Sequence, residues 1–226
     1  MQRFLLFLSS GLLFAGSTQA QFGLRAGSNL TGRTTESLLS EVGTSSVSRF
    51  GYQVGLSYQQ VLTKRLAVVP EVQFSRERQQ VYVNTFASYA SSRSSYRLNL
   101  SYLNVPVLVR FTVGPGYLEA GAQGSLLVGG RGEGATTGTT SAGTTYAQDI
   151  DQAATARYRR FEAGPCLGTG VKLPAGLGVN LRVYQSLVPL SRDDRYLTSQ
   201  DIPYIPGKQH RQTLQASLTY QVSTHQ

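Results

Sequence analysis

Seven charged residues lie in stretches where apolar and polar residues alternate, and each occupies a polar position of its stretch. Such alternation puts the charged side chains on one face of a β-strand and the apolar side chains on the other. Arginine and glutamate together support bidentate ion pairing, and an unpaired charge in an enclosed space costs several kcal/mol. If this face is enclosed, we expect a structural charge network formed by Arg25, Glu71, Arg110, Glu119, Glu162, Lys172 and Arg182.

Residues that could carry out catalysis are sparse, because the chain has two histidines and one cysteine. His210 lies in the same polar segment as Asp193 and Asp201, so an enzyme centre at the rim of the protein is one alternative. A single histidine in a polar segment is far more often solvated than catalytic. No metal-ligand spacing, phosphate-binding loop or nucleophile motif occurs in the sequence. We therefore predict no enzyme activity, no cofactor and no metal.

The elements that position the charged residues are about eight alternating segments. The clearest is residues 102–128, where two alternating runs flank the tight segment Val113-Gly114-Pro115-Gly116, as expected for a β-hairpin. Each segment is close to the length of a tilted strand that crosses a bilayer. The other segments are residues 22–30, 50–59, 66–75, 161–173, 177–184 and 214–222.

The connections between these segments alternate in length, which is informative about topology. Short connections at residues 61–65, 113–116 and 174–176 follow every second segment, whereas the others are long and polar. One of the long ones, the Gly- and Thr-rich residues 129–157, is expected to be a mobile loop. This sorting is typical of membrane barrels, whereas a soluble sandwich or lipocalin-type barrel would enclose its apolar face. We predict an all-β fold, an eight-stranded antiparallel up-and-down transmembrane β-barrel over residues 21–226.

The N-terminus is typical of export. Met1-Gln2-Arg3 precedes the apolar run Phe4 to Ala15 and small residues that end at Ala20. We interpret residues 1–20 as a cleavable signal peptide, with a retained anchor as the alternative. Cys166 is the single cysteine, so no intrachain disulfide can form, and we expect a packed thiol.

The chain carries a formal charge of +9, mostly from scattered arginines. Scattered basic residues fit anionic lipid surfaces better than nucleic acid, so no nucleic-acid partner is expected. Arginines in the predicted long connections could bind lipopolysaccharide phosphates, or they could simply keep these connections soluble. The arginines are Arg76, Arg78, Arg93 and Arg97, followed by Arg131, Arg192, Arg195 and Arg211.

Three stretches carry a resemblance to a known family. Residues 23–30 (GLRAGSNL), 69–75 (VPEVQFS) and 102–111 (YLNVPVLVRF) resemble the PorT-like outer-membrane β-barrel family of Bacteroidota, which is related to small OmpA/OmpX-type barrels. The resemblance implies an outer-membrane location and an eight-stranded barrel, and one founding member of the family is linked to protein secretion and gliding. The chain departs from the family at its end, because Ser223-Thr224-His225-Gln226 replaces the usual terminal aromatic residue.

Together these observations predict a non-enzymatic integral outer-membrane barrel with a plugged polar lumen and both termini in the periplasm. We expect a monomer with a structural or interaction role in the cell envelope, including assistance to protein secretion. Its expected partners are outer-membrane lipid, lipopolysaccharide and envelope or secretion-complex proteins. The alternatives are a narrow channel or small-solute or lipid-binding barrel, and an enzyme at the rim.

Overall fold

The computed structural model describes residues 20–36, 42–87, 90–140, 142–153, 155, 158–190 and 208–222. Apart from Ala20, the predicted signal peptide lies outside these residues. No helix in the described ranges is long and apolar enough to cross a membrane. The strands are β1 (Ala20–Glu36), β2 (Val42–Val61), β3 (Leu66–Ala87), β4 (Ala90–Val113), β5 (Gly116–Thr139), β6 (Thr145–Ala153), β7 (Phe161–Lys172), β8 (Leu177–Gln185) and β9 (Lys208–Val222).

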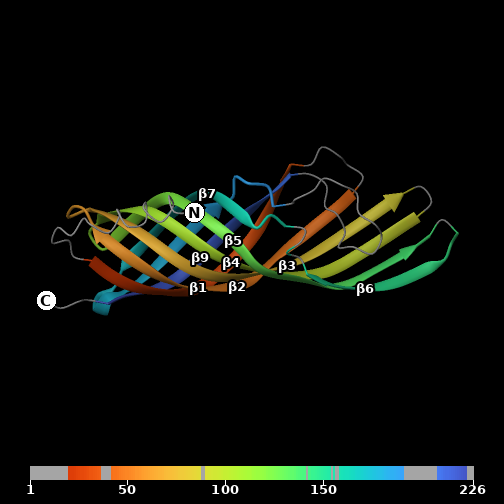
Figure 1. Ribbon diagram of the computed structural model, residues 1–226, viewed down its shortest axis with the longest axis horizontal. Coiled ribbons are helices and arrows are strands. Elements are labelled where there is room, and N and C mark those ends of the chain that lie inside the picture. The colour runs from red at the N-terminus through yellow and green to blue at the C-terminus, as the bar shows by residue number, and fades with distance from the viewer. Residues whose placement is uncertain are drawn as a thin grey trace, which may run out of the picture.

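Eight of these strands close into a ring. Antiparallel pairing runs from β1 through β5 to β7, β8 and β9, and β9 returns to β1 over the register Phe22↔Val222 to Glu36↔Lys208. Among the described strands β6 pairs with β5 alone, and it lies beyond the ring at the right of Figure 1. The predicted eight-stranded antiparallel barrel is confirmed.

The two faces of each strand differ in the sense expected for a membrane barrel. Leu181 on β8 is 50% exposed, whereas the next residue, Arg182, is 1% exposed. The same inversion holds along β4, where Val109 is exposed and Arg110 is buried. Because arginine is rarely buried without partners, a buried arginine beside an exposed aliphatic residue indicates a polar interior and an exterior suited to lipid.

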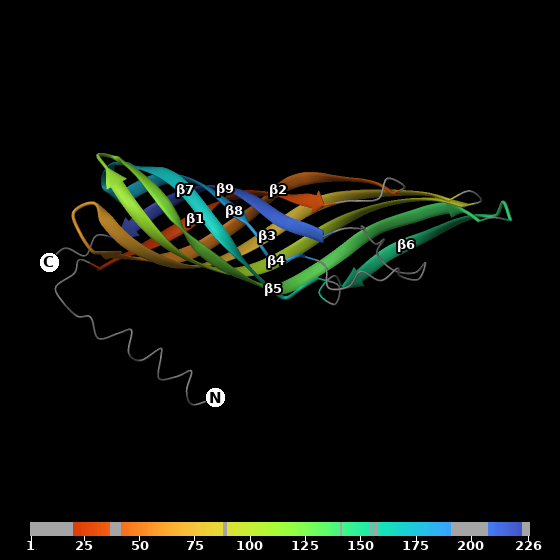
Figure 2. The same cartoon turned by 90° about the horizontal axis from the view of Figure 1, so that it is seen from above.

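The two ends of the barrel are built differently (Figures 1 and 2). The short connections after β2, β4 and β7 lie with the start of β1 and the end of β9 at one end, which we call the turn end. Strands β3, β4 and β5 continue past the other end, which we call the extended end, and β6 adds to β5 there. The third short connection contains a 3-10 turn, η2 (Pro174–Gly176).

The prediction of a mobile loop over residues 129–157 was wrong for most of that segment. Strand β5 continues to Thr139 and pairs with β6 from Thr139↔Thr145 to Arg131↔Ala153. Threonine is β-branched and favours strands, so a Thr-rich sequence can pair once a partner strand is present. Arg131 and Asp151 form an exposed ion pair at 2.6 Å, and the hydrogen bonds from Arg131 lower the pKa of Asp151.

The inner face changes from polar to apolar at the extended end. On β3 the inward residues are Glu71 to Gln79 within the ring, and then Val81 and Val83. An apolar cluster thus follows the polar residues of the lumen, and its member Leu190 donates a backbone hydrogen bond of 2.7 Å to the carbonyl oxygen of Gln209. The cluster consists of Val81, Val83, Tyr96, Leu98, Leu100, Tyr102, Leu127, Ile150, Tyr158 and Leu190.

Cys166 offers a direct test of side-chain direction, because it is fully buried while Leu167 beside it is 62% exposed. We expect Cys166 of the detergent-refolded barrel to resist N-phenylmaleimide until denaturant unfolds the chain. A Cys166→Ser/Leu167→Cys variant should react while still folded. Equal labelling of both folded proteins would contradict the assignment of the two faces.

Candidate functional site

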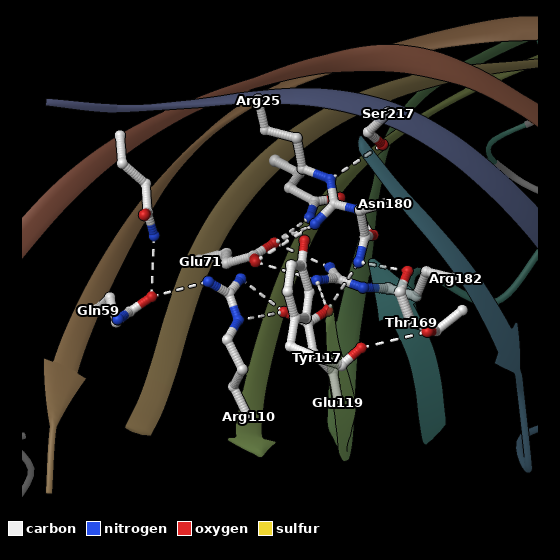
Figure 3. A network of polar contacts seen from close by, with 12 residues as sticks. Arg25, Gln59, Glu71, Arg110, Tyr117, Glu119, Thr169, Asn180, Arg182 and Ser217 are labelled. Atoms are coloured by element: carbon white, nitrogen blue, oxygen red, sulfur yellow. Dashed lines mark hydrogen bonds and ion pairs between the residues drawn. The ribbon is translucent and has the colours of Figure 1, made fainter. Parts of the chain in front are cut away.

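The candidate site is the interior of the barrel, where Arg182 binds two carboxylates. Its guanidinium makes a bidentate pair with Glu71, with Nη1–Oε2 at 2.8 Å and Nη2–Oε1 at 3.0 Å. Nη2 also donates to Glu119 Oε2 at 2.8 Å. In the ring, β8 and β3 are separated by three strands in either direction, so the Arg182–Glu71 pair spans the lumen (Figure 3).

Two further arginines complete this group, which we call the Arg182 cluster and which comprises Arg25, Glu71, Arg110, Glu119 and Arg182. Arg25 Nη1 lies 3.3 Å from Glu71 Oε2. Arg110 donates to Glu119 Oε1 through Nε at 2.8 Å and through Nη2 at 2.6 Å. All five side chains are therefore ion-paired, as buried charges require.

Neutral side chains add further hydrogen bonds to the Arg182 cluster (Figure 3). Arg25 donates to Ser217 Oγ at 3.0 Å and also to Asn180 Oδ1. Asn180 Nδ2 donates to Glu119 Oε2 at 3.1 Å, and Arg110 Nη1 donates to Gln59 Oε1 at 2.7 Å. The Arg110 guanidinium also lies 4.3 Å from the ring centre of Tyr117, within cation–π distance.

A glycine makes room for the contact between Arg182 and Glu119. Gly168 on β7 pairs with Glu119 on one side and with Arg182 on the other. A Cβ at Gly168 would lie 3.2 Å from Glu119 Oε2 and 3.5 Å from Arg182 Cβ. Because Gly168 has no side chain, the guanidinium can reach over β7 to the carboxylate.

A second group lies nearer the extended end, and we call Glu77, Glu162 and Arg211 the Arg211 cluster. Arg211 Nη1 lies 2.6 Å from Glu77 Oε1, and its Nε lies 2.9 Å from Glu162 Oε2. The guanidinium also lies 4.0 Å from the ring centre of Tyr102 and 4.8 Å from that of Tyr184. These three charges come from β3, β7 and β9, so they form a second contact across the lumen.

The two clusters balance each other in charge. The Arg182 cluster has three arginines and two glutamates, and the Arg211 cluster has one arginine and two glutamates. Within the described residues the buried charged side chains are these four arginines and four glutamates, so the formal charge sums to zero. A neutral, fully paired interior can be stable out of contact with bulk water.

The structure brings together six of the seven residues predicted from sequence, namely Arg25, Glu71, Arg110, Glu119, Glu162 and Arg182. Lys172 differs, because it ends β7 at the turn end, is half-buried, and has no ion pair within the described part of the chain. Inward amides flank the clusters, and among them Gln53, Gln73, Gln123 and Asn180 are at most 1% exposed.

Sequence reasoning missed Glu77 and misplaced Arg211. The prediction that Arg211 belongs to a basic loop was wrong, because Arg211 lies in β9 and is 1% exposed. A signal for both residues was present in the strand pattern. Glu77 continues the inward series of Glu71, Gln73 and Ser75, and Arg211 stands two residues before the inward Thr213.

The remaining predicted residues are distributed as follows. Arg76, Arg78, Arg93 and Arg97 are exposed as expected, but they lie in β3 and β4 and not in loops. His210 Nδ1 lies 3.2 Å from the carbonyl oxygen of Ser186, while the segment of residues 191–207, with its aspartates and with Arg192 and Arg195, lies outside the described residues. No group of three metal-ligating side chains occurs in the described part.

A lipid-suited exterior around an ion-paired interior defines an integral membrane β-barrel. The chain matches the family described as outer membrane protein beta-barrel domain over residues 14–192, and it belongs to this family. It is therefore an outer-membrane protein. A search of the curated proteins found no match.

Comparison with solved structures found small barrels of low identity. Neisserial surface protein A is 12% identical, with 89% of this chain and 97% of that chain covered and a TM-score of 0.44. OprG from Pseudomonas aeruginosa is 13% identical, with coverages of 92% and 99% and a TM-score of 0.42. Ail of Yersinia pestis, in complex with the heparin analogue sucrose octasulfate, is 11% identical, with coverages of 90% and 99% and a TM-score of 0.40.

Replacing Arg182 with methionine should destabilise the barrel strongly. The change removes the contacts from Arg182 to Glu71 and Glu119 and leaves the buried charges of the two clusters with a net charge of −1. Breaking a buried pair costs about 3–5 kcal/mol. Urea unfolding of the detergent-refolded protein measures this loss. The exposed Arg131→Gln variant is the control and should unfold like the wild type. An Arg182→Met barrel as stable as the wild type would contradict the role of the Arg182 cluster.

Replacing Gly168 with valine should separate Arg182 from Glu119. The valine methyl groups would enter the space between the two side chains, and such overpacking costs about 1–3 kcal/mol. Gly124→Val is the matched control, because the nearest atom to a Cβ there lies 3.7 Å away. If both variants unfold at the same urea concentration, the close approach at Gly168 is unimportant.

Proposed function

We propose that the protein is a non-conducting, non-enzymatic outer-membrane barrel that displays its extended end for interaction in the cell envelope. The observation that carries this proposal is the Arg182–Glu71 ion pair, which joins opposite strands and obstructs the lumen. The Arg211 cluster obstructs it at a second level, and the apolar cluster covers the extended end. A lumen enclosed by eight strands is wide enough only for side chains to fill.

The proposed orientation puts the turn end and both termini in the periplasm. Barrels of this class have short periplasmic turns and longer external segments, and the two ends of this barrel differ in that way. Strands β3 to β6 would then project outside the cell and carry the surface available to partners. As a finer proposal, the PorT-like resemblance supports a partner from an envelope or secretion complex, contacted by a monomeric barrel.

A second candidate function, a narrow passage or small-solute site, is favoured by one observation. Several buried amide oxygens in the lumen have no hydrogen-bond donor, and such atoms are suited to water or to a small polar solute. The oxygens belong to Asn29, Gln53, Gln73, Gln79, Asn104, Gln123 and Gln215.

Planar-bilayer recording distinguishes the two candidate functions. We expect no steady openings from the purified wild-type barrel, because paired side chains obstruct the lumen at two levels. The Glu71→Gln/Arg182→Gln variant removes one positive and one negative charge, keeps the interior neutral, and should conduct at least intermittently. Steady single-channel openings of the wild type would overturn the closed-lumen proposal and support a passage.

A further inference from the structure

Three arginines lie close together on the outer face of the barrel, and we call Arg49, Arg76 and Arg78 the arginine triad. All three are exposed. Arg49 on β2 lies directly opposite Arg78 on β3, and Arg76 is two residues before Arg78 on the same face. Directly opposed residues in an antiparallel pair have Cβ atoms about 4.5–5.5 Å apart, so the guanidinium groups of Arg49 and Arg78 share one small area.

No acidic side chain offsets this positive charge from the triad's own strands or from β4. The chain from residue 42 to residue 113 contains two acidic residues, Glu71 and Glu77, and both point into the lumen. Within the described residues no ion pair involves Arg49, Arg76 or Arg78. Like charges placed directly opposite each other destabilise a sheet unless an anion lies between them.

Other exposed arginines of this region differ from the triad in having acceptors close by. Arg131 is bound by Glu133 at 3.1 Å and by Asp151 at 2.6 Å. Arg97 lies opposite Glu133 in the register of β4 and β5, and Arg93 donates to Asn84 Oδ1 at 3.3 Å. The charge available to an external anion is therefore concentrated at the triad.

The position of the triad along the strands corresponds to the edge of the membrane. Tyr52 pairs with Arg76 in register, and its ring contacts Phe74 at a centroid distance of 6.4 Å. Exposed Val54 and Val72 follow toward the turn end. Aromatic residues mark the membrane–water boundary of barrels, so the triad stands at the level of lipid headgroups.

The polarity of β3 locates the same boundary independently. Before Arg76 the strand is apolar outside and polar inside, as at Val72 and Glu71. From Gln80 onward the outward residues Gln80, Tyr82 and Asn84 carry polar groups, and the inward residues are Val81 and Val83. The surroundings of the outer face therefore change from lipid to water within a few residues of the triad.

We propose that the arginine triad binds the phosphate groups of lipid A, the anionic glycolipid anchor of lipopolysaccharide. Guanidinium groups pair with phosphate in a bidentate manner, and three of them side by side can neutralise the two phosphates of one lipid A molecule. The proposal rests on the orientation given under the proposed function, in which the extended end faces outward. It does not depend on whether the lumen is closed.

The test is isothermal titration calorimetry, in which bisphosphorylated lipid A is added to the refolded full-length barrel in detergent. Removal of two charge-assisted contacts in Arg49→Gln/Arg78→Gln should weaken binding at least about tenfold. The Arg93→Gln/Arg131→Gln variant removes the same net charge and should bind like the wild type. Dephosphorylated lipid A should not bind, and higher salt should weaken the interaction with bisphosphorylated lipid A.

Three results would overturn the proposal. Equal weakening of both double variants would show a general effect of net charge and no built site. Unchanged binding by Arg49→Gln/Arg78→Gln would show that lipid A is held elsewhere. Equal affinity for phosphatidylglycerol vesicles would assign the triad to an inner-leaflet phospholipid and reverse the proposed orientation. The conductance recording decides separately whether the lumen is closed.

Discussion

The ion pair between Arg182 and Glu71 is the interaction on which the interior of this barrel depends. It joins strands on opposite sides of the ring, and Arg182 also holds Glu119. Burying these groups is tolerable only because every buried charge in the described residues has an opposite partner. Other features follow from this requirement: Gly168 leaves space for the guanidinium, Ser217 accepts a hydrogen bond from Arg25, and Asn180 donates one to Glu119.

The same strands serve two different surroundings without changing their side-chain alternation. Inside the membrane β3 and β4 turn valine and leucine outward and enclose glutamate, arginine and asparagine. At the extended end the outward residues become polar, and the enclosed ones become Val81, Leu98 and Leu100. An apolar core surrounded by polar residues is the arrangement of a water-soluble protein. The extended end can therefore stand in water as a small folded unit, continuous with a barrel whose polarity is reversed.

These two regions suggest how the protein works in the outer membrane. The barrel anchors the chain, and paired charges lie across its lumen. The extended end supplies the exposed surface, with β5 and β6 as its outermost hairpin (Figure 2). The arginine triad lies where the two regions meet. Contact with lipid A there would fix the depth of the barrel and the tilt of the strands above it.

The sequence by itself determined which face of each strand is polar, how many strands form the ring, and most members of the buried network, because side-chain alternation is local. It could not show that residues 129–157 continue as strands, since a Gly- and Thr-rich segment becomes a strand only beside a partner. It also could not show which arginine binds which glutamate. Arg182 and Glu71 are 111 residues apart, and Arg211 and Glu77 are 134 residues apart. Only closure of the ring brings these groups together, because each pair reaches across a lumen that no single hairpin contains.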